Sequence, residues 1–364
     1  MKLMLKYSYA SNSLSLSSLM LTVFLIAISC CAEKTLHAQS LDSIYRFSGG
    51  GGSTKTSGEV VDMTPAGVVV ESRGKTTTIP SQEIRKIVYS GQSSQLDRTR
   101  ARIMSGSFEQ GLAELEKVDD KKNIYVAHEI AFLKSWCHAN LAIDGRTPLK
   151  DGGTFVNSFL QKYKKSYHFY PMTELKGRLL QSLKLTDLAK AEFKQLAEAQ
   201  WPEYSYKGRY LLAETLNSQG QHAQAVSECD AILSSADNSD VAQQYKRLAT
   251  CAKAKSQALA GETAGIEEPI RQLVKVENPD NKQLFAAAYN AWGVYHFKAG
   301  RWKEAREKFL MTHLLMTSEA DAHAEALFYL SNIWPKLENT DQANKSRELL
   351  KSRYRNSYWA QQLN

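Results

Sequence analysis

Cysteine is scarce in this sequence and follows no pattern. Only Cys137, Cys229 and Cys251 lie beyond residue 38, and no two of them have the CxxC spacing. An odd number without that spacing indicates neither a disulfide framework nor a structural zinc site. We expect buried, small hydrophobic side chains. Cys229 and Cys251 fall on consecutive predicted helices, however, and could pair after export.

Signatures of catalysis are also missing. The sequence holds no Gly-x-Ser-x-Gly, no His-Glu-x-x-His and no paired carboxylates in an apolar setting. His128 and His138 are ten residues apart, as are His313 and His323. On a single helix that spacing puts each pair about 15 Å apart, too far for one metal ion. We therefore predict no catalytic residue, no metal site, no cofactor and no enzymatic activity.

The net charge of +8 comes without a long basic run. The first 38 residues carry three lysines and one glutamate, a net of +2, which leaves +6 for the remainder. Because the basic residues are scattered, nucleic-acid binding is not expected. A hydrophobic content of 43%, with 17 Tyr, 12 Phe and 6 Trp, is enough for a packed structure over most of the length.

The long apolar run stands at the beginning. Two lysines precede the apolar stretch Leu14 to Ala32, and Leu36-His37-Ala38 offers a small residue at a cleavage position. This pattern predicts a signal peptide over residues 1–38 and export to the periplasm or cell envelope. The run is barely long enough to span a bilayer, so an uncleaved anchor stays open. Ala27-Ile28-Ser29-Cys30 loosely resembles a lipobox, so a lipid anchor stays open as well.

A short β-rich stretch follows. The runs 59–63, 68–71, 76–79 and 84–89 are rich in Val, Ile and Thr and are separated by turn sequences. With 43–47 they make about five strands, which resembles a small SH3-like or Sm-like barrel. The Gly- and Ser-rich residues 39–57 are expected to form a lead-in and linker. That places the β module at 58–91, with residue 43 as the alternative start.

From residue 92 to residue 364 the pattern is helical and recurrent. A turn signature returns three times: a glycine, a ring-bearing residue two positions later and a small residue five positions later. The glycine ends one helix, and the small residue lets the two helices approach closely. The three instances are Gly106-Phe108-Gly111, Gly220-His222-Ala225 and Gly300-Trp302-Ala305.

The clearest repeat is 286–317, where two helices join at Gly300. Gly293, Ala305 and Phe309 are spaced by 12 and 16 positions, which resembles the 34-residue tetratricopeptide repeat. The resemblance implies a mainly α fold, an α-α superhelix of about seven helical hairpins over 92–364, preceded by the small β domain. Spacings of the same kind relate Gly177, Ala189 and Phe193, then Ala213 and Ala225, then Ser331 and Ala343.

A second recurring motif lies at the ends of two predicted hairpins. The motif Tyr-basic-x-Ser-Tyr occurs at Tyr163 to Tyr167 and again at Tyr354 to Tyr358. It is similar to the Tyr-Pro-x-Ser ending of tetratricopeptide proteins of the bacterial envelope, such as outer-membrane assembly lipoproteins and cell-division coordinators. Lys164 and Arg355 stand where that family has proline. The resemblance supports the envelope compartment.

By the same resemblance, the first helix of each hairpin lines a concave groove. Aromatic and amide side chains there suit recognition of a peptide, although packing between repeats is an equal alternative. The groove candidates are Tyr210, Glu214, Asn217 and Ser218 in one repeat, Asn290, Val294, Phe297 and Lys298 in the clearest repeat, and Phe328 and Asn332 in the last.

Together these observations predict an exported scaffold that binds other proteins or peptides, such as envelope complexes. The alternative is an accessory subunit of an envelope enzyme that binds glycan or wall polymer. The stretch 162–172 carries five ring-bearing residues among lysines, which could stack on a sugar or form a joint between helices. A third class, an RNA-binding Sm-like module, conflicts with the predicted signal peptide.

Overall fold

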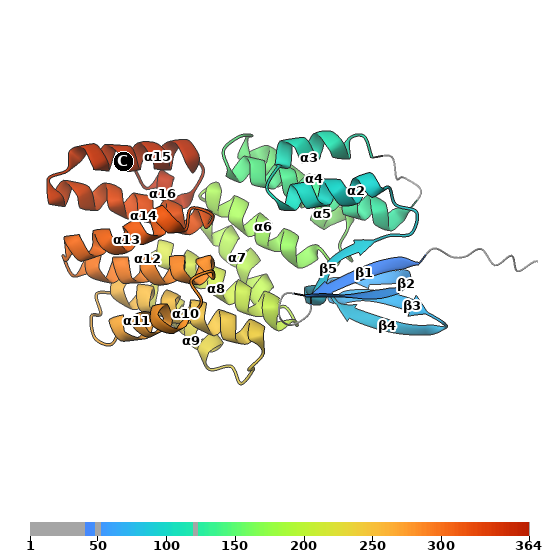
Figure 1. Ribbon diagram of the computed structural model, residues 1–364, viewed down its shortest axis with the longest axis horizontal. Coiled ribbons are helices and arrows are strands. Elements are labelled where there is room, and N and C mark those ends of the chain that lie inside the picture. Colours follow the sequence, from blue (N-terminus) through green and yellow to red (C-terminus); the bar gives the residue numbers. More distant parts are fainter. Residues whose placement is uncertain (1–40, 48–51, 119–122, 364) are drawn as a thin grey trace, which may run out of the picture. The chain divides into compact units, whose positions relative to one another are not determined.

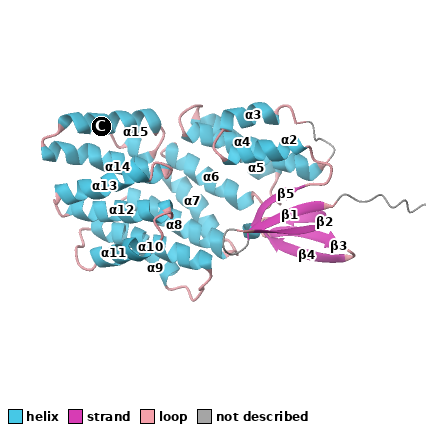
Figure 2. Ribbon diagram, in the orientation of Figure 1, coloured by secondary structure: helices cyan, strands magenta, loops and turns pink. Residues whose placement is uncertain are grey.

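The computed structural model describes residues 41–47, 52–118 and 123–363. The predicted signal peptide, residues 1–38, lies outside the described residues. Within them a small antiparallel sheet comes first and helices occupy the rest (Figure 1; Figure 2). The predicted fold class, a mainly α solenoid preceded by a small β module, is confirmed in this respect.

The sheet has five strands in the order β4-β3-β2-β1-β5. The long strand β2 pairs with β1 through its first half and with β3 through its second half. A 3-10 helix, Ser81–Glu83, joins β4 to β5. The strands are β1 (Asp42–Phe47), β2 (Ser53–Thr64), β3 (Gly67–Ser72), β4 (Lys75–Pro80) and β5 (Ile84–Val88).

One boundary differs from the sequence-based expectation. The predicted linker 39–57 includes β1 and the first residues of β2. Thr54 and Thr56 face Arg46 and Ile44 of β1 in the antiparallel register. Threonine favours extended backbone, and pairing satisfies the backbone groups that β1 would otherwise leave open on that side. The β module therefore extends upstream of residue 58, and its first strand begins at Asp42, next to the alternative start at residue 43.

In the described part of the chain, seven helix pairs follow the sheet. Each second helix packs against its own first helix and, in most pairs, against the first helix of the next pair, which is the stacking of a tetratricopeptide-like α-solenoid. The pairs are α2 (Ser94–Met104) and α3 (Phe108–Leu115), α4 (Ile124–Ile143) and α5 (Leu149–Lys162), α6 (Phe169–Ser182) and α7 (Thr186–Ala197), α8 (Pro202–Ser218) and α9 (His222–Leu233), α10 (Asp240–Leu259) and α11 (Glu267–Val276), α12 (Lys282–Lys298) and α13 (Trp302–Leu315), and α14 (Ala320–Ile333) and α15 (Thr340–Arg353). A 3-10 turn, Trp334–Leu337, extends α14, and the short α16 (Tyr358–Gln361) comes last.

Glycines end the first helices where the sequence signature places them. Gly220 and Gly300 have φ angles of 74° and 70°, a left-handed conformation that glycine adopts without a steric penalty. The next residue then reaches back to a helix carbonyl. Gln221 N–H donates to the Leu216 carbonyl and Arg301 N–H to the His296 carbonyl, each at 2.9 Å. This is the hydrogen-bond pattern of a Schellman cap.

Close contact within a pair depends on a missing side chain. A Cβ built on Gly293 would lie 2.7 Å from the ring of Phe309, and one on Gly177 would meet Phe193 in the same way. Both rings are fully buried. The glycine in the first helix therefore lets a phenylalanine of the second helix rest directly on its backbone. The alanines between them, Ala189 and Ala305, are also fully buried, as are Ala213, Ala225 and Ala343.

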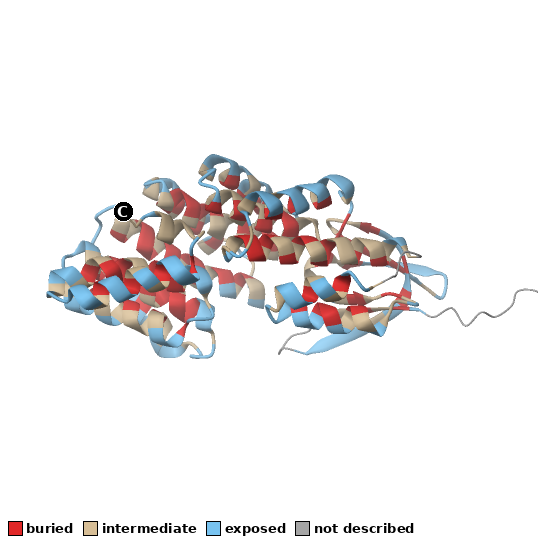
Figure 3. Cartoon of the chain, turned by 90° about the horizontal axis from the view of Figure 1, so that it is seen from above, coloured by how far each residue is buried: buried red, intermediate tan, exposed pale blue. Residues whose placement is uncertain are grey.

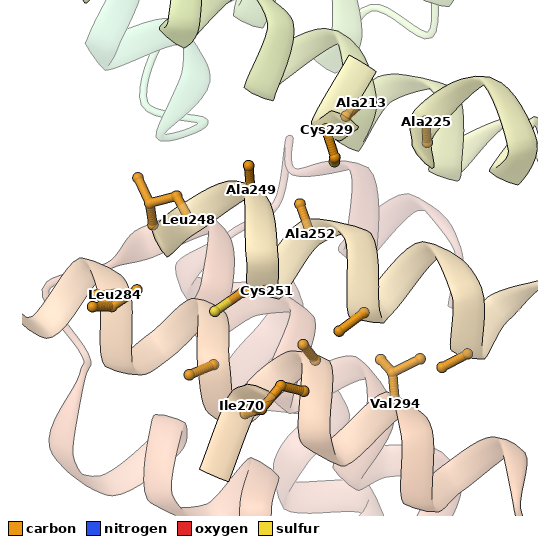
Figure 4. Close-up of a cluster of buried hydrophobic side chains, with 14 of the residues drawn as sticks. Ala213, Ala225, Cys229, Leu248, Ala249, Cys251, Ala252, Ile270, Leu284 and Val294 are labelled. Carbon is orange, nitrogen blue, oxygen red and sulfur yellow. The ribbon is translucent and has the colours of Figure 1, made fainter. Parts of the chain in front are cut away.

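Small side chains also dominate the core between α8 and α12 (Figure 4). Cys229 and Cys251 belong to it, and they and Cys137 are buried and free. Burial raises the pKa of each of these three thiols to about 12. They therefore remain neutral thiols with a packing role. Figure 3 shows buried positions alternating with exposed ones around the helices.

The sheet is joined to the helices at two places. Arg100 of α2 is buried and donates to the Ile87 carbonyl of β5 at 3.1 Å and to Glu129 of α4 at 2.8 Å. Near the start of α8, the indole N–H of Trp201 donates to the Ala66 carbonyl in the β2–β3 turn. The sheet therefore contacts both the first and the fourth helix pair.

The contact between Gly293 and Phe309 generates a stability prediction. Gly293→Ala forces the ring away and should lower the free energy of unfolding by about 1–2 kcal/mol, despite the better helix propensity of alanine. In a Phe309→Leu background the same substitution should cost less. Urea unfolding of the wild type, the two single variants and the double variant measures this double-mutant cycle. Gly153→Ala in α5 is the control, because a Cβ there meets nothing within 4 Å. It should be neutral or stabilising. Equal effects at both glycines would contradict the packing account.

Candidate binding surface on the first helices

Four consecutive first helices meet in a charged centre. Lys255 of α10 donates from Nζ to Glu214 of α8 at 2.5 Å and to both carboxylate oxygens of Glu325 of α14 at 3.3 Å. Asn290 of α12 donates to Glu325 at 3.0 Å and to the Ala322 carbonyl at 2.8 Å. We call Glu214, Lys255, Asn290 and Glu325 the inner cluster.

Burial sets the electrostatics of the inner cluster. Burial acts to lower the pKa of Lys255, but the carboxylates of Glu214 and Glu325 outweigh it and hold that pKa well above its ordinary value. Burial raises the pKa of Glu325, Lys255 opposes the rise and Glu214 adds to it. Lys255 therefore stays charged. Glu325 is the group of the cluster most ready to take up a proton.

A second set of charges joins α14 to α6. Arg178 of α6 donates to Asp321 at the start of α14 at 2.5 Å and to Glu174 at 3.1 Å. Lys207 of α8 lies 3.2 Å from the same Glu174 carboxylate. The first helices of the third, fourth and seventh pairs are thus connected by ion pairs. These ion pairs are partly exposed, with 35% of the Arg178 side chain and 74% of the Asp321 side chain accessible to solvent.

The predicted groove positions fall into two groups. Asn217, Asn290 and Val294 are buried, and Asn217 donates to Ser256 of α10 at 2.8 Å. Their side chains serve contacts between repeats. The half-buried or exposed positions lie on the same helices. They are Tyr210, Glu214, Ser218, Phe297, Phe328 and Asn332, which are half-buried, and Lys298, which is exposed.

Aromatic rings gather near the C-terminal ends of α12 and α14. The ring of Phe297 lies 5.3 Å from Trp302 and 5.0 Å from Tyr329, edge-on to both. Phe328 lies 5.4 Å from Tyr329. Asn332 donates to the Phe328 carbonyl at 2.8 Å. We call the half-buried Phe297, Phe328 and Asn332, with the exposed Lys298, the rim.

Lys255 and Glu325 were missed by the sequence analysis. Lys255 lies in a degenerate repeat that lacks the glycine and phenylalanine spacing. Glu325 is three residues before the predicted groove position Phe328. Each lies in an alanine-rich helical stretch that carries other charges as well, Lys253 before Lys255 and Asp321 before Glu325. The sequence therefore offered no signal that singled out either residue.

The ring-rich stretch 162–172 forms a joint rather than an open platform. His168 stacks on Phe132 with 3.5 Å between ring centroids, and its Nε2 lies 2.8 Å from Glu129. The Tyr167 hydroxyl donates to the same carboxylate at 3.2 Å. Burial acts to raise the pKa of Glu129, but Arg100 and His168 outweigh it and hold that pKa well below its usual range.

One histidine pair differs from the expectation. His128 and His138 share α4, but His313 lies on α13 and His323 on α14. A turn separates these two helices, so the axial spacing of 15 Å does not apply. His313 Nδ1 lies 2.8 Å from His323 Nε2, and His323 Nδ1 lies 2.6 Å from the Tyr354 hydroxyl. Among the described residues no group of three or more His, Cys, Asp or Glu could hold a metal ion.

Comparison with known proteins adds to this description. No family model and no curated protein sequence matches the chain. Among solved structures it is similar to a tetratricopeptide repeat protein from Parabacteroides merdae, at 15% identity over 71% of this chain and 91% of that one, with a TM-score of 0.49. It is also similar to a Rap protein complexed with Competence and Sporulation Factor, at 16% identity over 73% and 76%, with a TM-score of 0.45. The apo quorum sensor NprR from B. thuringiensis gives 14% over 70% and 85%, with a TM-score of 0.38.

No helix in the described part of the chain has both the length and the apolar character needed to cross a bilayer.

The inner cluster predicts that removing its cation costs more stability at pH 7.5 than at pH 5. Lys255→Met leaves two carboxylates facing each other and should lower the free energy of unfolding by about 3 kcal/mol at pH 7.5. The loss should shrink at pH 5. Without Lys255, the folded pKa of Glu325 is raised further above its unfolded value. The folded protein therefore takes up a proton at Glu325 as the pH falls, and this uptake stabilises it at low pH. Urea unfolding at both pH values measures it.

Lys253→Met is the matched control, because Lys253 lies on the same helix and pairs with Asp230 at 2.7 Å in a partly exposed setting. It should cost less than about 1 kcal/mol at either pH. If Lys255→Met cost no more than this control, the inner cluster would not hold the helices together.

The hydrogen-bonded row of His313, His323 and Tyr354 predicts a stability that depends on pH. Burial, His313 and Arg353 lower the pKa of His323 from 6.5 to about 4. Because the folded pKa lies below the unfolded one, the unfolded chain takes up this proton first as the pH falls. Stability is fully present above pH 6.5 and declines toward pH 4, by about 2–3 kcal/mol in total.

His323→Gln, which cannot titrate, should flatten the fall in stability between pH 6.5 and pH 4.5 by up to about 1.4 kcal/mol per pH unit. Tyr354→Phe should retain the slope while lowering stability at every pH, since it removes only the hydroxyl. Chemical unfolding across this range decides the matter. Identical slopes for wild type and His323→Gln would rule out His323 as the titrating group.

Proposed function

We propose that this chain is a non-catalytic scaffold that binds another protein or peptide at the rim. The observation that carries the proposal is the placement of the rim. Phe297, Phe328 and Asn332 retain exposed area at the ends of neighbouring first helices, while Lys255 and Glu325 of the inner cluster are buried and bonded to each other. Side chains held on rigid, ion-paired helices bind with little loss of conformational entropy.

The side chains of the rim indicate which class of partner fits it. Exposed edges of Phe297 and Phe328 suit an apolar or aromatic side chain, and the amide of Asn332 suits a peptide backbone. Lys298 adds a positive charge at the exposed end of α12. A peptide with an apolar residue near a carboxylate is therefore the partner class that fits best.

We also infer that the protein works in the cell envelope and that its β module is an SH3-like barrel. Export is supported by the basic residues and apolar run of the predicted signal peptide. The SH3-like assignment is supported by the strand order, by the sharing of β2 between two neighbours and by the 3-10 helix between β4 and β5. The buried free thiols require no particular redox compartment.

Charge reversal at the rim tests the proposed function. Immobilised wild-type chain and a Lys298→Glu variant would be exposed to envelope extract, with retained proteins quantified by mass spectrometry after cross-linking. We expect at least one partner to lose about tenfold or more in retention on Lys298→Glu, because the rim charge is reversed. Phe297→Ala is a poorer probe, since Phe297 also packs on Trp302 and Tyr329.

The matched control is Lys345→Glu, the same charge change at an exposed position of the second helix α15. It should retain partners like the wild type, and both variants should unfold like the wild type. Partners retained equally by the two variants, or none above the blank matrix, would remove the support for a binding rim.

A further inference from the structure

The last described segment, residues 355–363, returns to helices far back in the chain. We call it the closing segment. Its side chains donate hydrogen bonds to backbone carbonyls in the last turns of three first helices. These bonds run from Asn356 Nδ2 to Ala142 of α4 at 2.7 Å, from Gln361 Nε2 to Ser182 of α6 at 2.8 Å, and from the Tyr358 hydroxyl to Ser218 of α8 at 3.1 Å.

Such carbonyls are natural acceptors for a bound peptide. The last four carbonyls of a helix lack an intrahelical partner, so donors from outside satisfy them. Amide and hydroxyl groups of the closing segment do this at α6 and α8, and at α4 the amide of Asn356 shares the Ala142 carbonyl with the Gly145 N–H. Recognition of this kind depends on the ends of the helices and not on their side chains. An incoming chain with the same donors would therefore find the same acceptors.

Trp359 is the aromatic anchor of the closing segment. Its ring lies 5.2 Å from Phe328 and 5.7 Å from Tyr329 of α14. Phe328 is a rim residue, so the anchor covers part of the proposed binding surface. Ser357 accepts from the Ala360 N–H at 3.1 Å and starts the short helix that presents the ring. Tryptophan in such a position commonly dominates binding energy.

The closing segment rests on the surface and does not enter the core. Every residue from Arg355 to Leu363 is half-buried or exposed, whereas the preceding Tyr354 is buried and bonded to His323. Tyr354 therefore marks the point from which the segment could lift away without opening the helix pairs.

The sequence echo between two hairpins supports this interpretation. After Tyr163-x-x-Ser166-Tyr167 the chain continues into α6, and Tyr167 is buried against Glu129. After Tyr354-x-x-Ser357-Tyr358 it enters only the four-residue α16, and Tyr358 stays half-buried. The same motif thus leads once into a complete first helix and once into a single turn that rests on other first helices.

We propose that the closing segment is a resident ligand: it occupies in cis the site that a partner peptide enters by displacing it. The partner class is a narrower form of the one proposed for the rim. It is a short peptide whose apolar residue near the carboxylate is aromatic and is flanked by amide side chains, which would bond the carbonyls of α4, α6 and α8 and place its ring against Phe328. The claim that a partner uses this site rests on the proposed function. The displaceable segment can be tested by itself.

The test uses a fluorescein-labelled peptide of residues 355–363 and the full chain. In the wild type the tethered segment competes at an effective concentration in the millimolar range, so the peptide should bind weakly. Trp359→Ala weakens the tethered segment and should bind the peptide about 30-fold more tightly than wild type does, as measured by fluorescence anisotropy. A peptide with alanine in place of its tryptophan should not bind. Phe155→Ala, which removes an exposed ring of α5, should behave as wild type does.

A second variant guards against a folding defect. Asn356→Ala with Gln361→Ala removes two carbonyl bonds and leaves the Trp359 ring in place, and it too should bind the peptide more tightly than wild type does. The proposal is overturned if wild type and both variants bind the peptide equally, or if neither folded variant binds it.

The outcome separates this proposal from the proposed function. If the peptide never binds but retention of partners still depends on Lys298, only the resident ligand is lost. If the peptide binds the variants but no partner depends on Lys298, the proposed binding rim is lost and the displaceable segment stands.

Discussion

The structure depends on one buried cation shared between helices far apart in sequence. Lys255 lies between Glu214 and Glu325, and the second pair is separated by 70 residues. A buried charge is costly unless it is paired, so the helices that carry these groups must keep their register. Packing of small apolar residues alone would tolerate sliding of one first helix along the next. The inner cluster therefore specifies the arrangement of α8, α10, α12 and α14 more than it adds to stability.

A similar device joins the β module to the helices. Glu129 is buried among Arg100, Tyr167 and His168, which come from α2 and from the turn before α6. Arg100 also reaches the backbone of β5. Both junctions thus use a fully partnered charge where apolar contact would be less specific. Hydrogen-bonded polar networks of this kind rigidify the elements that they connect.

The proposed binding surface lies at the ends of the first helices rather than at their centre. Two of the predicted groove positions, Glu214 and Asn290, belong to the inner cluster. The ion pairs of Glu174, Arg178 and Asp321 join further positions of the first helices. The rim contains the exposed Lys298 and the half-buried Phe297, Phe328 and Asn332. The closing segment covers part of it, so access to the rim and the position of Trp359 are linked.

The sequence alone determined the features that depend on neighbours within about 20 residues. Glycine turns, the contact of Gly293 with Phe309 and the alternating strands follow from local spacing, and the fold class follows from their repetition. The centre of the site depended on the tertiary structure. Lys255 and Glu325 meet because small rotations between successive helix pairs accumulate. The spacing of residues within one pair does not predict the accumulated rotation. His313 and His323 lie together because a turn, and not a continuous helix, separates them. Whether a polar side chain faces a partner or a neighbouring helix is decided only when the pairs are stacked.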